Sequence, residues 1–265
     1  MYNEYEFKNK ELYFKHNITP AENCSSFAVH THNMYELLYF VSGNATYAIE
    51  DKRYKLKKGD LMLIRPLKYH FIEIEPTESY ERYDILFDER ALGVNFTDMI
   101  PDDIEVINIS ENPVAAEIFQ KLDLYSSKLS KDDFFSVLLL LINELFYALK
   151  IGRSFEKREI KEINPTLSAA LRYINDNLFS LQSISEVADA LFITESYLYR
   201  LFAKELKKTP KAYLREKRLL AAEDMISKGA KPTEIFSACG FLDYTVFYRN
   251  YKSFFGKSPS SSKIK

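Results

Sequence analysis

Between Phe27 and Phe87, apolar and polar side chains alternate over short stretches that are rich in β-branched and aromatic residues. A period of two is typical of strands with one buried face. Turn signals separate the stretches at Gly43-Asn44, at Gly59-Asp60 and at Pro66. The pattern therefore predicts a β-sandwich or barrel over about residues 20–90.

After these strands the apolar period becomes helical, first over residues 114–125 and then from Asp132 to Leu149. The second of these predicted helices is apolar over most of its circumference, so more than one side of it must be covered. We expect its own domain to cover one side. A second subunit could cover the other, which makes residues 111–150 the predicted homodimer interface.

The last hundred residues contain an internal repeat. The motif that begins at Tyr197 and contains Arg200 recurs 49 residues later around Arg249, and Lys208-Thr-Pro recurs as Lys257-Ser-Pro at the same offset. A repeat of this length, with room for two helices and a tight turn, is typical of a helix-turn-helix unit. We expect one long helix to join the two units and residues 151–165 to form a linker ahead of them.

Local signals agree with this reading of the repeat. Ser183 and Glu186 form a capping-box pattern, and Thr194 is a fitting N-cap for the helix that contains Arg200. In the second copy Gly240 can supply the turn and Asp243 can cap the final helix. The whole chain is thus predicted to be an α+β protein of two domains.

Composition removes several classes of function. The chain has neither a Gly-x-Gly-x-x-Gly nor a Gly-x4-Gly-Lys-Ser/Thr motif, which excludes the usual dinucleotide and P-loop sites. Cys24 and Cys239 are single and distant, so no disulfide framework or cysteine-based zinc module is indicated. Residues 1–14 are acidic where a signal peptide would be basic, and residues 134–149 are too short for a bilayer span. We therefore expect a cytoplasmic protein without a membrane partner.

Charge is distributed unevenly between the two parts. Residues 1–165 carry 20 Lys and Arg against 28 Asp and Glu, whereas residues 166–265 carry 16 against 10. A basic last third on an acidic body suggests a module that binds a polyanion. Two helices on one rigid connector can enter successive major grooves of DNA, about 34 Å apart.

The residues that face DNA follow from the helical period. In the first recognition helix Leu198, Leu201 and Phe202 are expected to face inward, which leaves as DNA-facing candidates Ser196, Tyr199, Arg200 and Lys204. In the second, Phe247 and Tyr251 are expected to face inward, which leaves Tyr244, Thr245, Tyr248, Arg249 and Lys252. An arginine on such a helix can make a bidentate contact with guanine.

These motifs resemble the AraC family of transcriptional regulators. The resemblance covers about residues 166–263 and rests on Cys239-Gly240-Phe241, on Phe247-Tyr-Arg249-Asn-Tyr251-Lys252 and on Gly256-Lys-Ser258-Pro259. It implies that the chain binds double-stranded promoter DNA and activates or represses transcription, with RNA polymerase as a partner of an activator. Three positions depart from the family pattern: Phe236 replaces a small residue, Lys207 replaces a glycine, and Ser262-Lys263 replaces a closing Tyr-Arg.

The N-terminal half is similar to cupins. His30-x-His32-x3-Glu36-x6-Gly43 resembles the first cupin motif, and Gly59-Asp60, Pro66 and His70 resemble the second. The resemblance implies a small barrel with a cavity, and in metal-binding cupins His30, His32, Glu36 and His70 would be ligands. Imidazole and carboxylate suit manganese, iron, nickel or zinc. We favour an organic, carbohydrate-like effector over a metal, because Tyr35, Tyr39, Tyr47 and Tyr69 are expected near the barrel.

The chain is therefore expected to be an effector-controlled DNA-binding regulator, with no catalytic residues and no required cofactor. Residues 1–150 are predicted to form a sensor and dimerisation domain, and residues 166–265 a tandem helix-turn-helix domain. The effector candidates are His30, His32, Glu36, Tyr47 and His70. Two alternatives stay open: a metal-dependent cupin enzyme with a fused helical domain, and a DNA-binding regulator that needs no effector.

Overall fold

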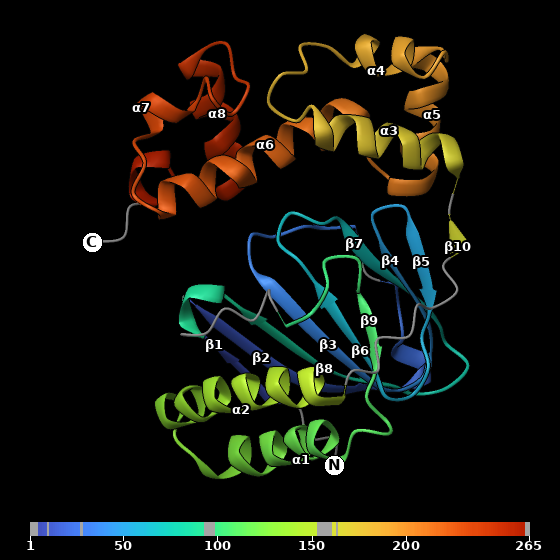
Figure 1. The fold of residues 1–265 in the computed structure, drawn as a ribbon, viewed down its shortest axis with the longest axis vertical. Coiled ribbons are helices and arrows are strands. Elements are labelled where there is room, and N and C mark those ends of the chain that lie inside the picture. The colour runs from blue at the N-terminus through green and yellow to red at the C-terminus, as the bar shows by residue number, and fades with distance from the viewer. Residues whose placement is uncertain are drawn as a thin grey trace. The chain divides into compact units, whose positions relative to one another are not determined.

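The computed structural model describes residues 5–9, 11–26, 29–92, 99–152, 161–162 and 164–262. Phe27, Lys263 and most of the predicted linker lie outside the described residues. The chain divides into two compact units, the first built mainly from residues 1–160 and the second mainly from residues 161–265 (Figure 1). The fold class is α+β, as predicted from the sequence.

The first unit contains two antiparallel β-sheets. The larger sheet has six strands, in the order β1 (Tyr5–Lys8), β2 (Leu12–Thr19), β8 (Tyr80–Phe87), β3 (Tyr35–Ser42), β6 (Asp60–Ile64) and β9 (Val106–Asn108). The smaller sheet contains β5 (Lys52–Lys55), β4 (Asn44–Ile49) and β7 (His70–Glu75) in that order. The sheets form a sandwich-like layer pair and do not close into one barrel. Short 3-10 turns span Ala21–Asn23 and Glu89–Ala91.

The predicted strand region, about residues 20–90, was too narrow. Strands β1 and β2 precede it and β9 follows it. β2 runs along the whole of β8, from the Leu12–Phe87 pair to the Thr19–Tyr80 pair, so it is integral to the larger sheet. Its burial alternates as in a strand with one buried face, with Leu12, Phe14 and His16 buried.

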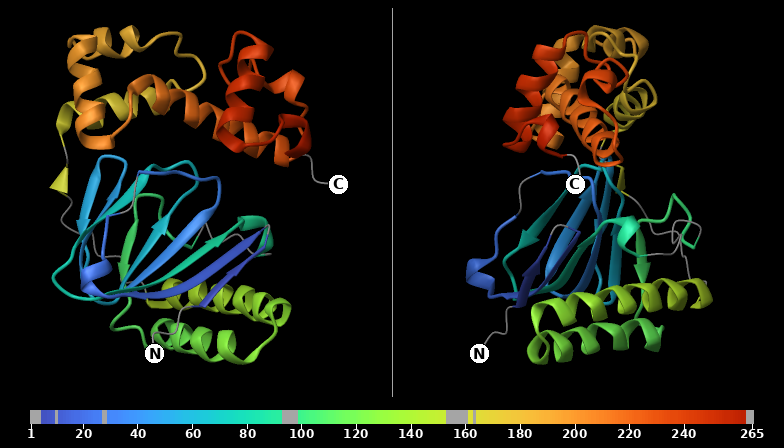
Figure 2. Two further views of the ribbon diagram at one scale, coloured as in Figure 1. Left: turned by 180° about the vertical axis from the view of Figure 1, so that it is seen from behind. Right: turned by 90° about the vertical axis from the view of Figure 1, so that its left-hand side faces the viewer.

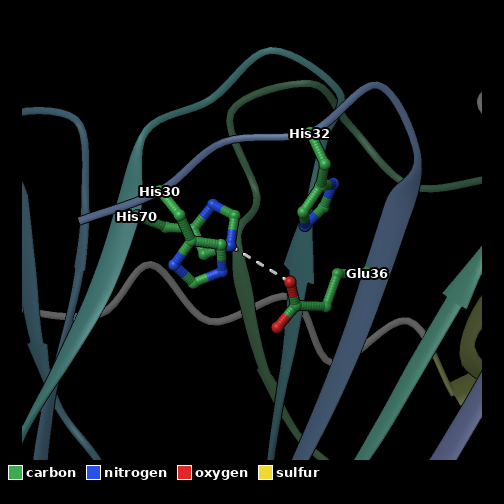
Figure 3. A group of neighbouring side chains, drawn as sticks. All are labelled: His30, His32, Glu36 and His70. Carbon is green, nitrogen blue, oxygen red and sulfur yellow. Dashed lines mark ion pairs between the residues drawn. The ribbon is translucent and has the colours of Figure 1, made fainter. Parts of the chain in front are cut away.

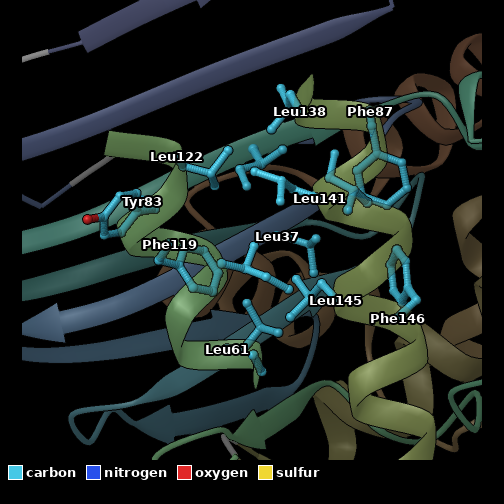
Figure 4. Packing of buried hydrophobic residues seen from close by; sticks show 14 of the residues in the cluster. Leu37, Leu61, Tyr83, Phe87, Phe119, Leu122, Leu138, Leu141, Leu145 and Phe146 are labelled. Carbon is cyan, nitrogen blue, oxygen red and sulfur yellow. The ribbon is translucent and has the colours of Figure 1, made fainter. Parts of the chain in front are cut away.

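Helices α1 (Pro113–Lys128) and α2 (Lys131–Gly152) cover one face of the larger sheet (Figure 2). Asn112 caps α1 by accepting a hydrogen bond from the Ala115 N–H. Figure 4 shows Leu37 of the sheet between Phe119 of α1 and Leu145 of α2, and Phe87 of the sheet beside Phe146 of α2. This layer is the main hydrophobic core of the first unit, and a second apolar cluster lies between the two sheets.

Helix α2 is long and apolar enough, by length and composition alone, to cross a membrane. Nine of its residues are instead buried inside the first unit, so it is a core helix. Its most exposed apolar side chains are Leu140 at 69%, Ile151 at 81% and Tyr147 at 48%. Their spacing of seven and eleven residues puts them on one narrow stripe. Much of the apolar circumference that suggested a dimer is therefore covered within the chain.

The second unit contains the predicted pair of helix-turn-helix motifs. After β10 (Lys161–Glu162), the first motif comprises α3 (Pro165–Asp176), α4 (Ile184–Ala190) and α5 (Glu195–Leu206). The long α6 (Pro210–Ser227) leads to the second motif, α7 (Pro232–Ile235) and α8 (Tyr244–Phe255), and to a 3-10 turn at Pro259–Ser262. Figure 1 shows α6 running from one motif to the other.

The predicted caps are confirmed. Thr194 accepts a hydrogen bond from the Tyr197 N–H at the start of α5, and Asp243 accepts one from the Val246 N–H at the start of α8. The Glu186 carboxylate accepts a hydrogen bond from the Ser183 N–H, which completes the capping box of α4. Side-chain oxygens thus satisfy backbone donors that a helix start leaves without partners.

The two copies of the motif differ in their turns. Gly240 has the left-handed φ of +79°, and Phe192, 48 residues earlier, has φ +55° although it is not a glycine. Lys207, which stands where the family has glycine, also has φ +55°. Phe236, the bulky departure in the second copy, is half-buried, and its ring packs edge-on against Tyr244 at 5.6 Å. The second motif therefore accommodates Phe236 at the start of α8.

Candidate DNA-binding surface and sensor site

Helix α5 separates its apolar and polar residues as the sequence predicted. Leu198, Leu201 and Phe202 are buried against the rest of the second unit. The four candidates for DNA contact are accessible: Ser196, Arg200 and Lys204 are exposed and Tyr199 is half-buried. The Arg200 guanidinium lies 5.2 Å from the ring of Tyr197, which restrains the arginine side chain at the helix surface.

Helix α8 repeats this arrangement. Phe247 and Tyr251 are fully buried, while the candidate residues are exposed or half-buried: Tyr244, Thr245, Tyr248, Arg249 and Lys252. The Tyr251 hydroxyl donates a hydrogen bond to Glu223 of α6, and the Lys257 ammonium lies 2.7 Å from the same carboxylate. These contacts anchor α8 to the connecting helix and leave its polar face free.

Arg218 of α6 joins the two motifs. Its guanidinium donates to the carbonyls of Leu178 at 2.7 Å and Leu181 at 2.5 Å, both in the loop before α4, and to the carbonyl of Gly240 at 2.9 Å. A Cβ atom at Gly240 would lie 2.6 Å from Cζ of Arg218, so a larger residue there would displace the arginine. The sequence predicted a connecting helix but gave no indication of this role of Arg218, because carbonyl partners leave no mark in the sequence.

The four residues of the cupin-like motifs meet in one cluster. The ligand atoms of His30, His32, Glu36 and His70 all lie within 4.8 Å of one another (Figure 3). Glu36 comes from β3 and His70 from β7, and both are buried, whereas His30 is exposed and His32 half-buried. The cluster therefore has a buried floor and an accessible rim.

Hydrogen bonds orient the floor of this cluster. His70 places Nδ1 2.9 Å from the Lys68 carbonyl and Nε2 3.1 Å from the Glu36 carboxylate. Tyr47, the fifth effector candidate, is buried, and its hydroxyl donates to Glu36 at 3.2 Å. Burial disfavours the imidazolium of His70, but the hydrogen bond and charge of Glu36 outweigh it and raise the pKa of His70. Burial and the charge of Glu36 raise the pKa of Tyr47.

The structure adds polar residues that the sequence analysis missed. On β8, the side chains of Tyr83, Ile85 and Phe87 face α1 and α2. The residues that alternate with them point to the opposite face of the sheet; they include Tyr80, Arg82 and Asp84. Arg82 lies 4.0 Å from Asp84 and 5.2 Å from the Tyr80 ring centroid. Burial and the nearby charge of Glu36 raise the pKa of Asp84 to about 7. The alternation along this strand is visible in the sequence, but it does not show that these residues lie near Glu36.

Two of the tyrosines expected near the barrel face helices α1 and α2. Tyr39 stacks on Phe119 of α1 at 4.0 Å, and Tyr35 stacks on Phe87 at 5.6 Å, so both belong to the layer between the sheet and the helices. Their odd positions in β3 put them on the face opposite to Glu36. Both therefore belong to the larger sheet but lie on the face away from Glu36.

The cluster can act on a ligand in two ways. Its buried carboxylate, phenol and imidazoles can exchange hydrogen bonds with the hydroxyl groups of a polar molecule. The donor set also fits a divalent cation, because the Lys68 carbonyl fixes the tautomer of His70 and leaves Nε2 as the ligand atom. Among the described residues, Oδ1 of Asp84 is a buried acceptor without a hydrogen bond.

Comparison with known proteins finds a matching family model for each part of the chain. A family model described as an AraC-like ligand binding domain matches residues 16–122, and one described as a helix-turn-helix domain matches residues 187–263. The Msm operon regulatory protein of Streptococcus mutans is 21% identical over 98% of this chain and 95% of its own length. The lactose operon transcription activator of Staphylococcus xylosus is 24% identical over 82% of this chain and 79% of its own length. The probable transcriptional regulator LumQ of Photobacterium leiognathi is 27% identical over 60% of this chain, and the match spans 64% of LumQ.

Proposed function

The chain belongs to the AraC family of transcriptional regulators, and from that membership we propose how its two units act. The second unit binds promoter DNA by placing α5 and α8 in successive major grooves. The first unit binds a small-molecule effector that controls this activity in the cytoplasm. The relatives are transcriptional regulators and not enzymes, which removes support from the alternative of a cupin enzyme.

One observation carries the DNA-binding proposal: two capped helices present exposed polar faces from a single connecting helix. The proposed contacts are made by Ser196, Tyr199, Arg200, Lys204, Tyr244, Thr245, Tyr248, Arg249 and Lys252. An arginine that binds guanine bidentately contributes about 1–3 kcal/mol of discrimination.

The test is selection of fragmented genomic DNA by the purified protein at ~150 mM salt, followed by sequencing. We expect one shared element that Arg200→Glu and Arg249→Glu each lose. Arg172→Glu, an exposed position on α3, is the matched charge reversal and should retain the element. Retention of DNA without any shared element, or an unchanged element in both variants of the recognition helices, would contradict the proposal.

The proposed effector site comprises His30, His32, Glu36, Tyr47 and His70. We favour a carbohydrate, since these groups exchange hydrogen bonds with hydroxyls and one relative is named as a lactose operon activator. Thermal unfolding of the full chain should be measured with a panel of neutral mono- and disaccharides that includes lactose. We expect one sugar to raise the unfolding temperature, and Glu36→Gln to remove that shift while Glu78→Gln, an exposed control, retains it. Each sugar is tested in 10-fold concentration steps up to its solubility limit. If no sugar shifts the unfolding temperature, the carbohydrate proposal is refuted.

A divalent cation is the second candidate occupant, favoured by the orientation of His70 against the Lys68 carbonyl. In that case His30, His32, Glu36 and His70 would hold the ion. No cofactor is required by the proposal. Equilibrium dialysis against zinc, manganese, nickel or iron(II) should show about one ion per chain, lost in His70→Gln, if the cation is the resident ligand. Substoichiometric binding that His70→Gln does not change would exclude it.

We also propose that the regulator is a homodimer through residues 111–150. The exposed stripe of Leu140, Tyr147 and Ile151 supports this, and a groove of about 770 Å³ next to it is lined by Val114 and Tyr147. Light scattering at micromolar concentration should find a dimer that Leu140→Asp converts to a monomer. If the protein activates transcription, RNA polymerase is a further partner.

A further inference from the structure

A groove of about 430 Å³ lies between the two recognition helices. Tyr199 of α5 forms part of one wall, and Val246 and Asn250 of α8 form part of the other. Residues of α6 that share one helical face form part of its lining: Lys211, Leu214, Arg215 and Arg218. The groove is therefore continuous with the helices proposed to read DNA.

Lys211 and Arg215 bring uncompensated charge to this groove. Both side chains are exposed, and neither makes a hydrogen bond or ion pair among the described residues. Arg218 is different, because three backbone carbonyls already occupy its guanidinium. Glu195, at the start of α5, is the one acidic residue in the lining. The groove carries a positive balance from residues that the recognition helices do not supply.

The length of α6 relates this charge to DNA. Its 18 residues span about 27 Å, close to the ~34 Å that separates successive major grooves on one face of the duplex. When the two recognition helices enter those major grooves, the intervening minor groove and its flanking phosphates face the stretch of protein between them. Lys211 and Arg215 lie in that stretch.

We infer that Lys211 and Arg215 bind the phosphates that flank the minor groove between the two base-reading helices. The inference rests on the proposed DNA-binding function and adds a contact that carries no base sequence of its own. These two side chains fix the register of the duplex against the protein, while α5 and α8 supply sequence preference.

The salt dependence of binding tests this inference. Fluorescence anisotropy of the full chain with the selected DNA element should be measured at several salt concentrations. Each phosphate contact makes the slope of log K against log salt more negative by about 0.9, so Lys211→Met with Arg215→Met should reduce the magnitude of the slope by about 1.8. The same contacts correspond to about a 30-fold loss of affinity at ~150 mM salt. The preferred element should not change.

The matched control is Arg172→Met with Lys228→Met, which removes the same charge from exposed positions outside the groove lining. Its slope should equal that of the unaltered protein. Unfolding curves of both double variants establish that each is folded, as expected for exposed positions.

Three results overturn the inference. An unchanged slope in the groove variant, with binding still lost in Arg200→Glu, refutes the phosphate contacts and leaves the proposed function intact. A changed base preference at an unchanged slope means that these residues read minor-groove bases instead. Absence of a shared element with the unaltered protein refutes the proposed function, and the inference with it.

Discussion

Replacing Arg218 by methionine should loosen the connection between the two helix-turn-helix motifs. Methionine retains an apolar stem but donates no hydrogen bond, so the carbonyls of Leu178, Leu181 and Gly240 lose their shared partner. Hydrogen bonds from a charged donor contribute about 1.5–3 kcal/mol each. Part of this gain offsets the cost of burying the guanidinium, a cost that also lowers the pKa of Arg218. We expect a net destabilisation of the second unit of about 3 kcal/mol.

Hydrogen exchange of the full chain, read by mass spectrometry, can locate this loss. Amides around Leu181 and around Gly240 should exchange about 100-fold faster in Arg218→Met, because the free energy of local opening falls by ~3 kcal/mol. Arg172→Met is the control, because it makes the same substitution at an exposed site and should shift stability by less than about 0.5 kcal/mol. Protection that is unchanged at both places in Arg218→Met would refute the role of the arginine.

A second substitution tests the same contact from its other side. Gly240→Ala puts a Cβ atom against the guanidinium at a left-handed φ of +79°, so it should destabilise the second unit by itself. Because the alanine also displaces Arg218, the effects of Gly240→Ala and Arg218→Met should not add. Full additivity would mean that the two residues act independently.

Three further outcomes follow from the structure. Lys207→Gly and Phe192→Gly should each stabilise the second unit by about 1 kcal/mol in chemical unfolding, since both residues adopt φ +55°; destabilisation would show that these side chains contribute contacts that outweigh strain. The His16 ring lies 2.8 Å from the Asp123 carboxylate of α1 and 3.0 Å from the Glu81 carboxylate of β8, and it stacks on the Tyr83 ring. Burial alone would lower the pKa of His16, but the two carboxylates raise it. The contribution of His16 to the free energy of unfolding should therefore be complete below about pH 6.5 and decline as pH rises through the raised folded pKa. His16→Gln should then cost more free energy of unfolding at pH 6 than at pH 9. An equal cost at both pH values would contradict the ion pairs. At concentrations at which the protein is monomeric, Leu140→Asp should leave the unfolding free energy of the first unit almost unchanged, because the side chain is 69% exposed in the single chain, and a large loss would place it in the core instead.

The second unit was the easier part to predict from the sequence. Its signals are local: Thr194 and Asp243 cap their helices within three residues, and the repeat aligns α5 with α8. The bridge made by Arg218 escaped prediction because its partners are backbone carbonyls 22 to 40 residues away. Spacing and capping rules describe neighbours along one helix and carry no information about such contacts.

The residues of the cupin-like motifs could be named from the sequence, but their surroundings could not. His30, His32, Glu36 and His70 were identified from two separate motifs and do come together. Which tyrosines accompany them depends on strand register, and a shift of one residue moves a side chain to the other face. Tyr47 points to Glu36, whereas Tyr39 points to α1, and only the pairing of the strands decides between these outcomes.

The two faces of strand β8 contact different parts of the protein. Arg82 and Asp84 face the side of the sheet that holds Glu36, while Tyr83, between them, donates a hydrogen bond to Asp123 of α1 at 2.5 Å. A ligand that hydrogen-bonds to Asp84 would therefore lie one residue away from the contact between the Tyr83 hydroxyl and α1. A screen for variants that respond without effector, or ignore it, should therefore return alternating positions along this one strand.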